Sequence, residues 1–403
     1  MEPDLLRTPE GEAALTAAAA ADGGDLLAAA AGLRRAGFPP DLASAALTQV
    51  ELRRKAVLKF GADAEVMFFT RAGLEQATRA TVAARRAARL HDAGVRVLAD
   101  LGCGLGADAI AAARKGIRVH AVEADPHTAA LTRANVAALK LDHLITVTTG
   151  DATEADLSDV DAVFCDPARR ASKTGRRVFD PASFSPPWDF VAGLATRVPR
   201  TVLKLAPGID HALIPAGAEA EWVSVGGDVV EAAFWCGPLA GVPRRATVLP
   251  GTPGTTALPG TTALTGDADV PARVGGVRRY VYDPDGAVVR AHLVAAFADR
   301  VGGVLADPEI AYVYADAPAP TGFGRCLEVL DTMPFSLKRL RAEMRRRAVG
   351  RVEILKRGSA LDVQQLRKDL RLSGPEGLSL VLTRVAGAPV TLLCRPVPPG
   401  NLS

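Results

Sequence analysis

The chain has 403 residues, of which 48% are hydrophobic and 23% charged, and its formal net charge is +3. This length allows more than one buried core, so we expect two or three domains. The five cysteines lie far apart without metal-ligand spacing, and the N-terminal stretch resembles neither a signal peptide nor a membrane span. These features argue against a disulfide-stabilised or membrane protein and against structural zinc, and they predict a reduced cytoplasmic protein.

Residues 1–90 predict an all-helical region. Alanine-rich segments with apolar residues at spacings of three and four are separated by Gly, Pro or Asp signals. The expected helices cover residues 5–19, 25–36, 40–58 and 71–90. Basic residues cluster on the last two helices, and we interpret them as solvated helix faces.

From residue 95 the pattern changes to alternating strands and helices. Such alternation is typical of βαβ units around a parallel sheet, which predicts an α/β domain over residues 91–249. The segments 222–225 and 229–236 then predict a hairpin, with 245–249 as a candidate third strand. The expected strands of the parallel part are 95–101, 118–123, 144–149, 161–166 and 200–205, and the expected helices are 107–115, 126–139 and 187–196.

Residues 250–270 are rich in Gly, Pro and Thr and predict a linker. Residues 271–403 follow as an expected α+β domain. Between Asp331 and Arg371, twelve Lys and Arg stand against five Asp and Glu, so this stretch carries seven positive charges in excess. The asymmetry indicates that the C-terminal part of the chain meets a polyanion.

A glycine-rich loop follows the first strand of the predicted sheet. Asp100 stands near the end of the apolar run, and Gly102, Gly104 and Gly106 follow at alternate positions. Glycines let the backbone turn tightly and let a ligand lie against it. The loop fits two classes of nucleotide cofactor, dinucleotides and S-adenosylmethionine, so the loop alone does not decide between them.

Acidic residues also end the next three strands, at Glu123, Asp151 and Asp166. The carboxyl ends of parallel strands meet at one edge of a sheet, where ligands bind. Acids there suit a cofactor that carries positive charge, whereas a dinucleotide pyrophosphate favours N–H donors. A carboxylate at Glu123 can accept both ribose hydroxyls, and Asp151 can accept from an adenine amino group.

Together these motifs resemble the class I S-adenosylmethionine-dependent methyltransferases, which have a Rossmann-like sheet. The resemblance implies an enzyme with S-adenosyl-L-methionine as its cofactor. It also implies that the loop from Asp100 to Gly106 holds the amino-acid portion of the cofactor, Glu123 the ribose and Asp151 the adenine region.

Asp166, Pro167, Ala168 and Arg169 follow the fourth strand. They resemble the Asp-Pro-Pro-aromatic motif of amine-methylating nucleic-acid methyltransferases, in which the acid and a proline carbonyl accept hydrogen bonds from the target amine. Asp166 and Pro167 are therefore the candidate catalytic residues. Ala168 and Arg169 depart from that motif, which argues against base stacking and an exocyclic amine. The loop also resembles that of RNA 5-methyluridine methyltransferases, but residues 203–208 lack their cysteine nucleophile, which disfavours carbon methylation.

Two groups of cations are candidate substrate contacts. Five follow the Asp166 loop within nine residues, a pattern typical of a solvated loop or a phosphate clamp. Others lie on an expected basic helix near residues 337–347. The candidate substrate-binding residues are Arg169, Arg170, Lys173, Arg176, Arg177, Arg345 and Arg346.

Residues 351–358, 382–384 and 393–395 resemble the THUMP-like module at the C-terminus of a group of bacterial methyltransferases, and residues 59–61 and 69–78 also resemble that group. THUMP modules deliver RNA to modifying domains, so the resemblance implies tRNA or rRNA as partner. We expect methylation of a base nitrogen in RNA, without an obligate protein partner. Two alternatives stay open: a small-molecule methyltransferase, and a non-catalytic RNA-binding protein with this fold.

Overall fold

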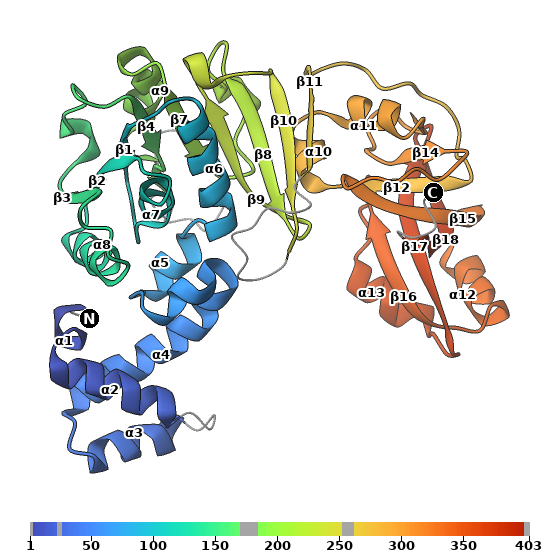
Figure 1. Cartoon of the computed structure of the whole chain (residues 1–403). Coiled ribbons are helices and arrows are strands. Elements are labelled where there is room, and N and C mark those ends of the chain that lie inside the picture. The colour runs from blue at the N-terminus through green and yellow to red at the C-terminus, as the bar shows by residue number, and fades with distance from the viewer. Residues whose placement is uncertain (1–2, 22–25, 170–183, 252–261, 399–403) are drawn as a thin grey trace. The chain divides into compact units, whose positions relative to one another are not determined.

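The computed structural model describes residues 3–21, 26–169, 184–251 and 262–398 (Figure 1). The chain divides into two units. The first consists of residues 1–219, 231–241 and 250–260, and the second of residues 220–230, 242–249 and 261–403. None of the helices in these described parts of the chain is long and apolar enough to cross a membrane.

The described residues up to Asp92 form helices and short connections, in agreement with the all-helical region predicted over residues 1–90. The helix expected over 71–90 is two helices, because the backbone from Ala77 to Arg79 is extended and Lys59 donates to carbonyls at the end of the shorter one. The apolar faces of these helices bury residues such as Leu42, Phe60 and Leu90 in the same core as the parallel sheet. The helices are α1 (Pro3–Leu6), α2 (Pro9–Ala20), α3 (Leu26–Arg35), α4 (Pro40–Phe60), α5 (Arg71–Gln76) and α6 (Ala80–Asp92).

The larger sheet has the predicted parallel part, in which five strands run in the order β3-β2-β1-β4-β7. The order reverses between β1 and β4, so the carboxyl ends of these two strands flank the topological switch point where ligands bind in such sheets. These strands are β1 (Val97–Leu101), β2 (Arg118–Glu123), β3 (Ile145–Thr149), β4 (Ala162–Cys165) and β7 (Thr201–Leu205), with helices α7 (Ala107–Ala113), α8 (Pro126–Ala138) and α9 (Trp188–Arg197).

Beyond β7 the sheet continues in the order β9-β8-β10-β11. β9 (Asp228–Trp235) pairs antiparallel with β7. On its other side β9 is bonded to β8 (Glu219–Val225), as the predicted hairpin requires. β10 (Arg244–Leu249) pairs parallel with β8. The segment expected as a linker contains a further strand, β11 (Thr262–Gly266), which pairs antiparallel with β10.

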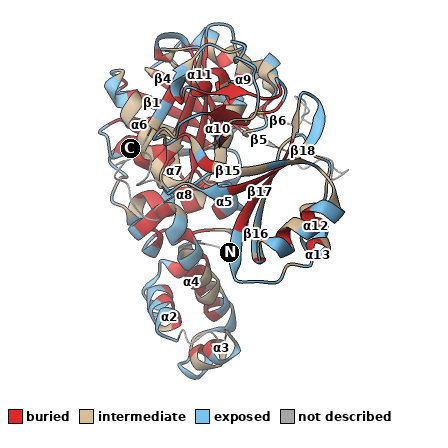
Figure 2. Cartoon of the chain, turned by 90° about the vertical axis from the view of Figure 1, so that its right-hand side faces the viewer, coloured by how far each residue is buried: buried red, intermediate tan, exposed pale blue. Residues whose placement is uncertain are grey.

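The second unit contains a seven-stranded sheet in the order β13-β14-β12-β15-β18-β17-β16. Helices α12 (Leu337–Arg346) and α13 (Val363–Leu370) pack on it through buried leucines and Met344, and their outer faces are exposed (Figure 2). The remaining elements are β12 (Tyr280–Pro284), α10 (Gly286–Arg290), α11 (Val294–Arg300), β13 (Val304–Leu305), β14 (Val313–Ala315), β15 (Gly324–Pro334), β16 (Val349–Lys356), β17 (Glu376–Val385) and β18 (Ala388–Pro396).

Candidate active site

The glycine-rich loop between β1 and α7 has backbone angles that require glycine. Gly102, Gly104 and Gly106 have φ values of +83°, +54° and +85°, in the left-handed region. A Cβ at Gly102 would lie 2.9 Å from the carbonyl oxygen of Asp166, whereas a Cβ at Gly104 would meet no atom of the chain within 4 Å. Packing therefore demands glycine at the first position, and at Gly104 the loop leaves open space in which a ligand can lie.

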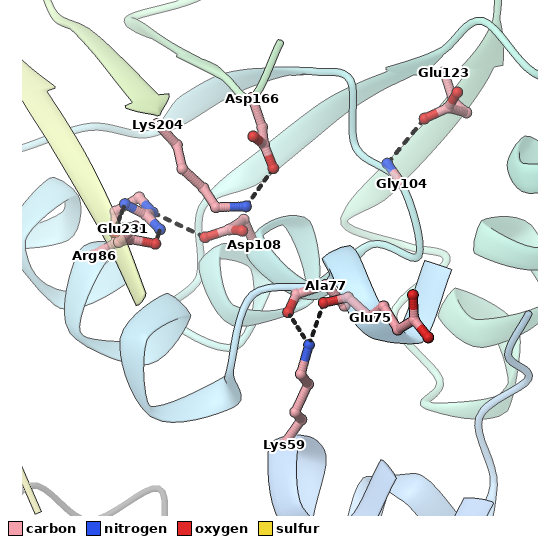
Figure 3. A network of polar contacts seen from close by, with 10 residues as sticks. All are labelled: Lys59, Glu75, Ala77, Arg86, Gly104, Asp108, Glu123, Asp166, Lys204 and Glu231. Carbon is pink, nitrogen blue, oxygen red and sulfur yellow. Dashed lines mark hydrogen bonds and ion pairs between the residues drawn. The ribbon is translucent and has the colours of Figure 1, made fainter. Parts of the chain in front are cut away.

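Glu123, at the end of β2, is tied to this loop. Its Oε2 accepts a hydrogen bond of 3.0 Å from the backbone N–H of Gly104 (Figure 3). Its Oε1 accepts one of 3.0 Å from the N–H of Asp125. Each carboxylate oxygen has two acceptor positions. One position on each oxygen remains, which is what two adjacent ribose hydroxyls need.

Asp151 lies directly after β3 and begins a short 3-10 turn. Its Oδ1 accepts hydrogen bonds of 2.8 Å from the backbone N–H and from the hydroxyl of Thr153. These bonds hold the pKa of the Asp151 carboxyl below its usual value. The side chain is exposed at the same sheet edge as Glu123, so its position agrees with the predicted adenine contact, which stays a prediction.

Asp100 is buried in β1 with an exposed fraction of 0%. Neither of its carboxylate oxygens has a hydrogen-bond partner among the described residues. Burial, and after it repulsion by Asp108 and Asp166, raises the pKa of Asp100 well above its usual value. Leaving a buried polar group unsatisfied costs roughly 1–3 kcal/mol. An acid without a partner, beside a glycine loop, is suited to bind a cofactor that carries positive charge.

Asp166 follows β4 at the switch point and forms an ion pair with Lys204 of β7. The Nζ of Lys204 donates to Oδ2 of Asp166 (Figure 3). Burial alone would lower the pKa of Lys204, but attraction to Asp166, and then to Asp108 and Glu231, outweighs it and raises that pKa. Sequence reasoning missed Lys204. The available signal was one lysine in an apolar strand, next to the carboxyl edge.

Below this pair lies a buried network around Arg86 of α6 (Figure 3). Two nitrogens of Arg86 donate to Glu231 of β9 at 2.9 and 3.0 Å, and its Nε donates to Asp108 of α7 at 2.9 Å. Burial would raise the pKa of Asp108, but Arg86 holds it below its usual value. Arg86 is 3% exposed, so the prediction of a solvated basic face on this helix is wrong for Arg86.

The comparisons with known proteins agree with this geometry. A methyltransferase domain model matches residues 98–178, a THUMP domain-like model matches residues 324–396, and a domain of unknown function matches residues 4–56. An uncharacterized S-adenosylmethionine-dependent methyltransferase, found in two strains of Mycobacterium tuberculosis, is 35% identical over 378 residues, which is 86% of this chain and 95% of that relative. The chain belongs to the S-adenosylmethionine-dependent methyltransferases.

The expected fold, cofactor and enzyme class of this methyltransferase are thereby confirmed. A solved structure of a methyltransferase from Porphyromonas gingivalis W83 has the same fold, with a TM-score of 0.70 and 24% identity. The similarity covers 90% of this chain and 92% of that one. The predicted THUMP-like character of the C-terminal region is confirmed as well.

The N-terminal region of the methyltransferase is bonded to the glycine-rich loop through Asn135 of α8. The side chain of Asn135 in α8 accepts a hydrogen bond of 2.6 Å from the N–H of Phe68 and donates to the carbonyls of Phe68 and Leu105 at 3.2 and 3.1 Å. A Cβ on Gly73 of α5 would lie 3.1 Å from the side chain of Leu105. The segment before α6 therefore lies against the glycine loop and helps to hold its conformation.

The predicted substrate-binding cations fall into three groups. Arg169 ends β5 (Ala168–Arg169), which pairs with β6 (Phe184–Ser185) directly after the Asp166 loop. Arg345 and Arg346 are exposed on α12 in the second unit, and Arg346 is paired with Glu343 of the same helix. Arg170, Lys173, Arg176 and Arg177 lie outside the described residues.

Pro167 and Cys165, on either side of Asp166, are both buried. Burial raises the pKa of the Cys165 thiol far above its usual value. A thiol that resists ionisation is a poor nucleophile. The structure therefore offers Asp166 and Lys204 at the switch point, and Cys165 belongs to the core of the sheet.

Proposed function

We propose that this methyltransferase methylates a base nitrogen in tRNA or rRNA, with Asp166 accepting a hydrogen bond from that nitrogen. The observation that supports this is the position of Asp166 at the switch point. Its side chain is 35% exposed, and among the described residues only Oδ2 of its two oxygens has a donor. A carboxylate with one free oxygen can orient an N–H group and take up its proton.

The cofactor roles follow from the contacts of the loop. Asp100 and the glycines from Gly102 to Gly106 would hold the amino-acid portion, Glu123 the ribose and Asp151 the adenine region. Bound S-adenosylmethionine supplies a methyl group carried on a positively charged sulfur. The buried Asp100 would offer that cofactor a carboxyl group without a partner among the described residues, and Asp166 with Pro167 would position the nitrogen that receives the methyl group.

The exposed faces of α12 and α13 would hold the RNA. On α12, Lys338, Arg339 and Arg345 have no ion-pair partner among the described residues, whereas Arg346 and Arg347 are paired with Glu343. Unpaired cations release counterions from a phosphate backbone, and cations that are already neutralised contribute less. The match of residues 324–396 to a THUMP-like module supports this assignment to RNA.

The test is methylation of bulk RNA from a strain that lacks the gene, with isotope-labelled cofactor and nucleoside mass spectrometry. We expect the full-length protein to label RNA, and Asp166→Ala to reduce labelling by about 10²-fold or more. Asp142→Ala is the matched control, because Asp142 is an exposed acid of the same unit without a hydrogen-bond partner among the described residues. Unchanged labelling by Asp166→Ala would contradict the proposal. Turnover with a metabolite extract but not with RNA would favour a small-molecule substrate.

A further inference from the structure

Asp166 and Lys204 place an acceptor and a donor side by side at the switch point. Asp166 directly follows β4, and Lys204 is the residue before the last one of β7. These two strands are neighbours, and Cys165 of β4 pairs with Leu203 of β7. An ammonium group has three N–H donors, and Lys204 uses one of them on Asp166. Among the described residues the other donors of Lys204 and Oδ1 of Asp166 have no partner. The pair can therefore form further hydrogen bonds of both kinds, through the two remaining donors of Lys204 and through Oδ1 of Asp166.

Lys59 of α4 shows what a purely structural lysine looks like in the same unit. Its Nζ donates to three backbone carbonyls, those of Leu74 and Glu75 at 2.7 Å and that of Ala77 at 3.1 Å (Figure 3). These three bonds use all the donors of Lys59. Lys204 differs because Asp166, its hydrogen-bond partner among the described residues, is a side chain that the proposed function places against the substrate.

We infer that Asp166 and Lys204 together recognise a lactam edge, an N–H beside a C=O, and that the methylated atom is the lactam nitrogen of guanine or uracil. This inference rests on the proposed function and narrows its substrate class. Asp166 would accept from the ring N–H, and Lys204 would donate to the adjacent carbonyl oxygen.

The charges of the pair favour a lactam over an exocyclic amine. Adenine and cytosine also present a donor beside an acceptor, their amino group beside a ring nitrogen. An ammonium donating to that ring nitrogen would withdraw the electron pair of the amino group and weaken it as a nucleophile. A lactam behaves in the opposite way, because stabilising its oxygen makes its nitrogen easier to deprotonate and more nucleophilic.

The proposed methyl transfer uses only the lactam, the cofactor, Asp166 and Lys204. The lactam nitrogen forms a bond to the methyl carbon while the bond from that carbon to sulfur breaks, and the bonding electrons return to sulfur. The N–H proton passes to Asp166, and Lys204 stabilises the negative charge that develops on the lactam oxygen. The product is a neutral N-methyl lactam, and no other reactant is needed.

The first test is the identity of the labelled nucleoside in the bulk-RNA experiment. We expect label in 1-methylguanosine or 3-methyluridine. Label in an exocyclic amine, such as N6-methyladenosine or N4-methylcytidine, or on ribose or carbon, would overturn the inference. An exocyclic amine would leave the proposed function intact, whereas absence of label from every RNA nucleoside would refute the proposed function itself.

The second test is the pH dependence of Lys204→Met. We expect a loss of about 10²–10³-fold near neutral pH, the usual effect of removing one donor to a developing oxyanion. The loss should shrink as pH rises toward the range in which a lactam N–H ionises in water, because the substrate then supplies the anion itself. A loss that is equal at all pH values would overturn the role of Lys204 at the lactam oxygen.

Two controls separate this effect from misfolding. Lys204→Arg keeps a cationic donor and should retain more activity than Lys204→Met. Lys115→Met removes an exposed lysine of the same unit and should leave the pH profile unchanged. Thermal unfolding and calorimetric cofactor binding are measured for each variant. The charged groups around Lys204, which are kept intact in all variants, are Asp166, Asp108, Glu231, Arg86, Asp100 and Lys59.

Discussion

Asp100 and Asp108 are two buried carboxylates of the same site with opposite pKa shifts, and this makes a sharp test of the electrostatics. The pKa of Asp100 is raised by burial, so in the folded chain Asp100 binds its proton more tightly than in the unfolded chain. Stability from this group is complete below the ordinary pKa of an aspartate and is lost as pH rises toward the raised value. The pKa of Asp108 is lowered by Arg86, so its contribution is present above the ordinary value and is lost as pH falls.

The perturbations are Asp100→Asn and Asp108→Asn, each compared with the unchanged chain. The free energy of unfolding of Asp100→Asn minus that of the unchanged chain should increase by about 1.4 kcal/mol per pH unit, from about pH 4 up to the raised pKa of Asp100. Asp108→Asn should be less stable than the unchanged chain above that pH, and the difference should narrow in acid. Urea unfolding from about pH 2 to pH 8 measures both, because the window for Asp108 lies below the ordinary pKa of an aspartate. Parallel pH curves for Asp100→Asn and the unchanged chain would refute the assignment of Asp100 as a buried, unpaired acid.

Three further predictions use other parts of the molecule. Arg86→Met leaves two buried carboxylates without their partner, so we expect a loss of about 3–5 kcal/mol in free energy of unfolding, measured by urea titration. Gly102→Ala and Gly104→Ala each place a side chain at positive φ, which costs about 1–2 kcal/mol. Calorimetry should show that Gly104→Ala loses more free energy of cofactor binding than free energy of unfolding. Unchanged cofactor affinity would contradict the assignment of the loop to cofactor binding. For Arg345→Gln, the slope of the logarithm of the RNA-binding constant against the logarithm of salt concentration should fall in magnitude by about 0.7–0.9, and for Arg346→Gln by less. Fluorescence anisotropy titrations at several salt concentrations measure both slopes.

The parallel sheet was predictable because its strands are short apolar runs with helical segments between them. Buried strands of this kind carry their signal locally, and their order follows from the handedness of βαβ units. The acids at the strand ends were predictable for the same reason. Once the strand ends are known, Asp100, Glu123, Asp151 and Asp166 must come to one edge.

Contacts between distant residues were not predictable from local patterns. Arg86 looks like a surface residue of an alanine-rich helix, because its partner Glu231 is 145 residues away in the sequence. The break between α5 and α6 depends on Lys59, which donates to carbonyls 15 to 18 residues further along the chain. The role of Lys204 depends on a pairing of β4 with β7 that no periodicity reveals.

The buried charges of the site divide into those that the fold neutralises and those that it leaves for ligands. Arg86 neutralises Asp108 and Glu231, so these groups hold α6, α7 and β9 together and are unavailable to a substrate. Lys204 and Asp166 satisfy each other only in part, and so keep one acceptor and spare donors facing the switch point. Asp100 has no partner at all among the described residues. On the proposed function, a positively charged cofactor would therefore meet the acid that the fold has left unpaired, and a base with complementary polar groups would meet the half-satisfied pair.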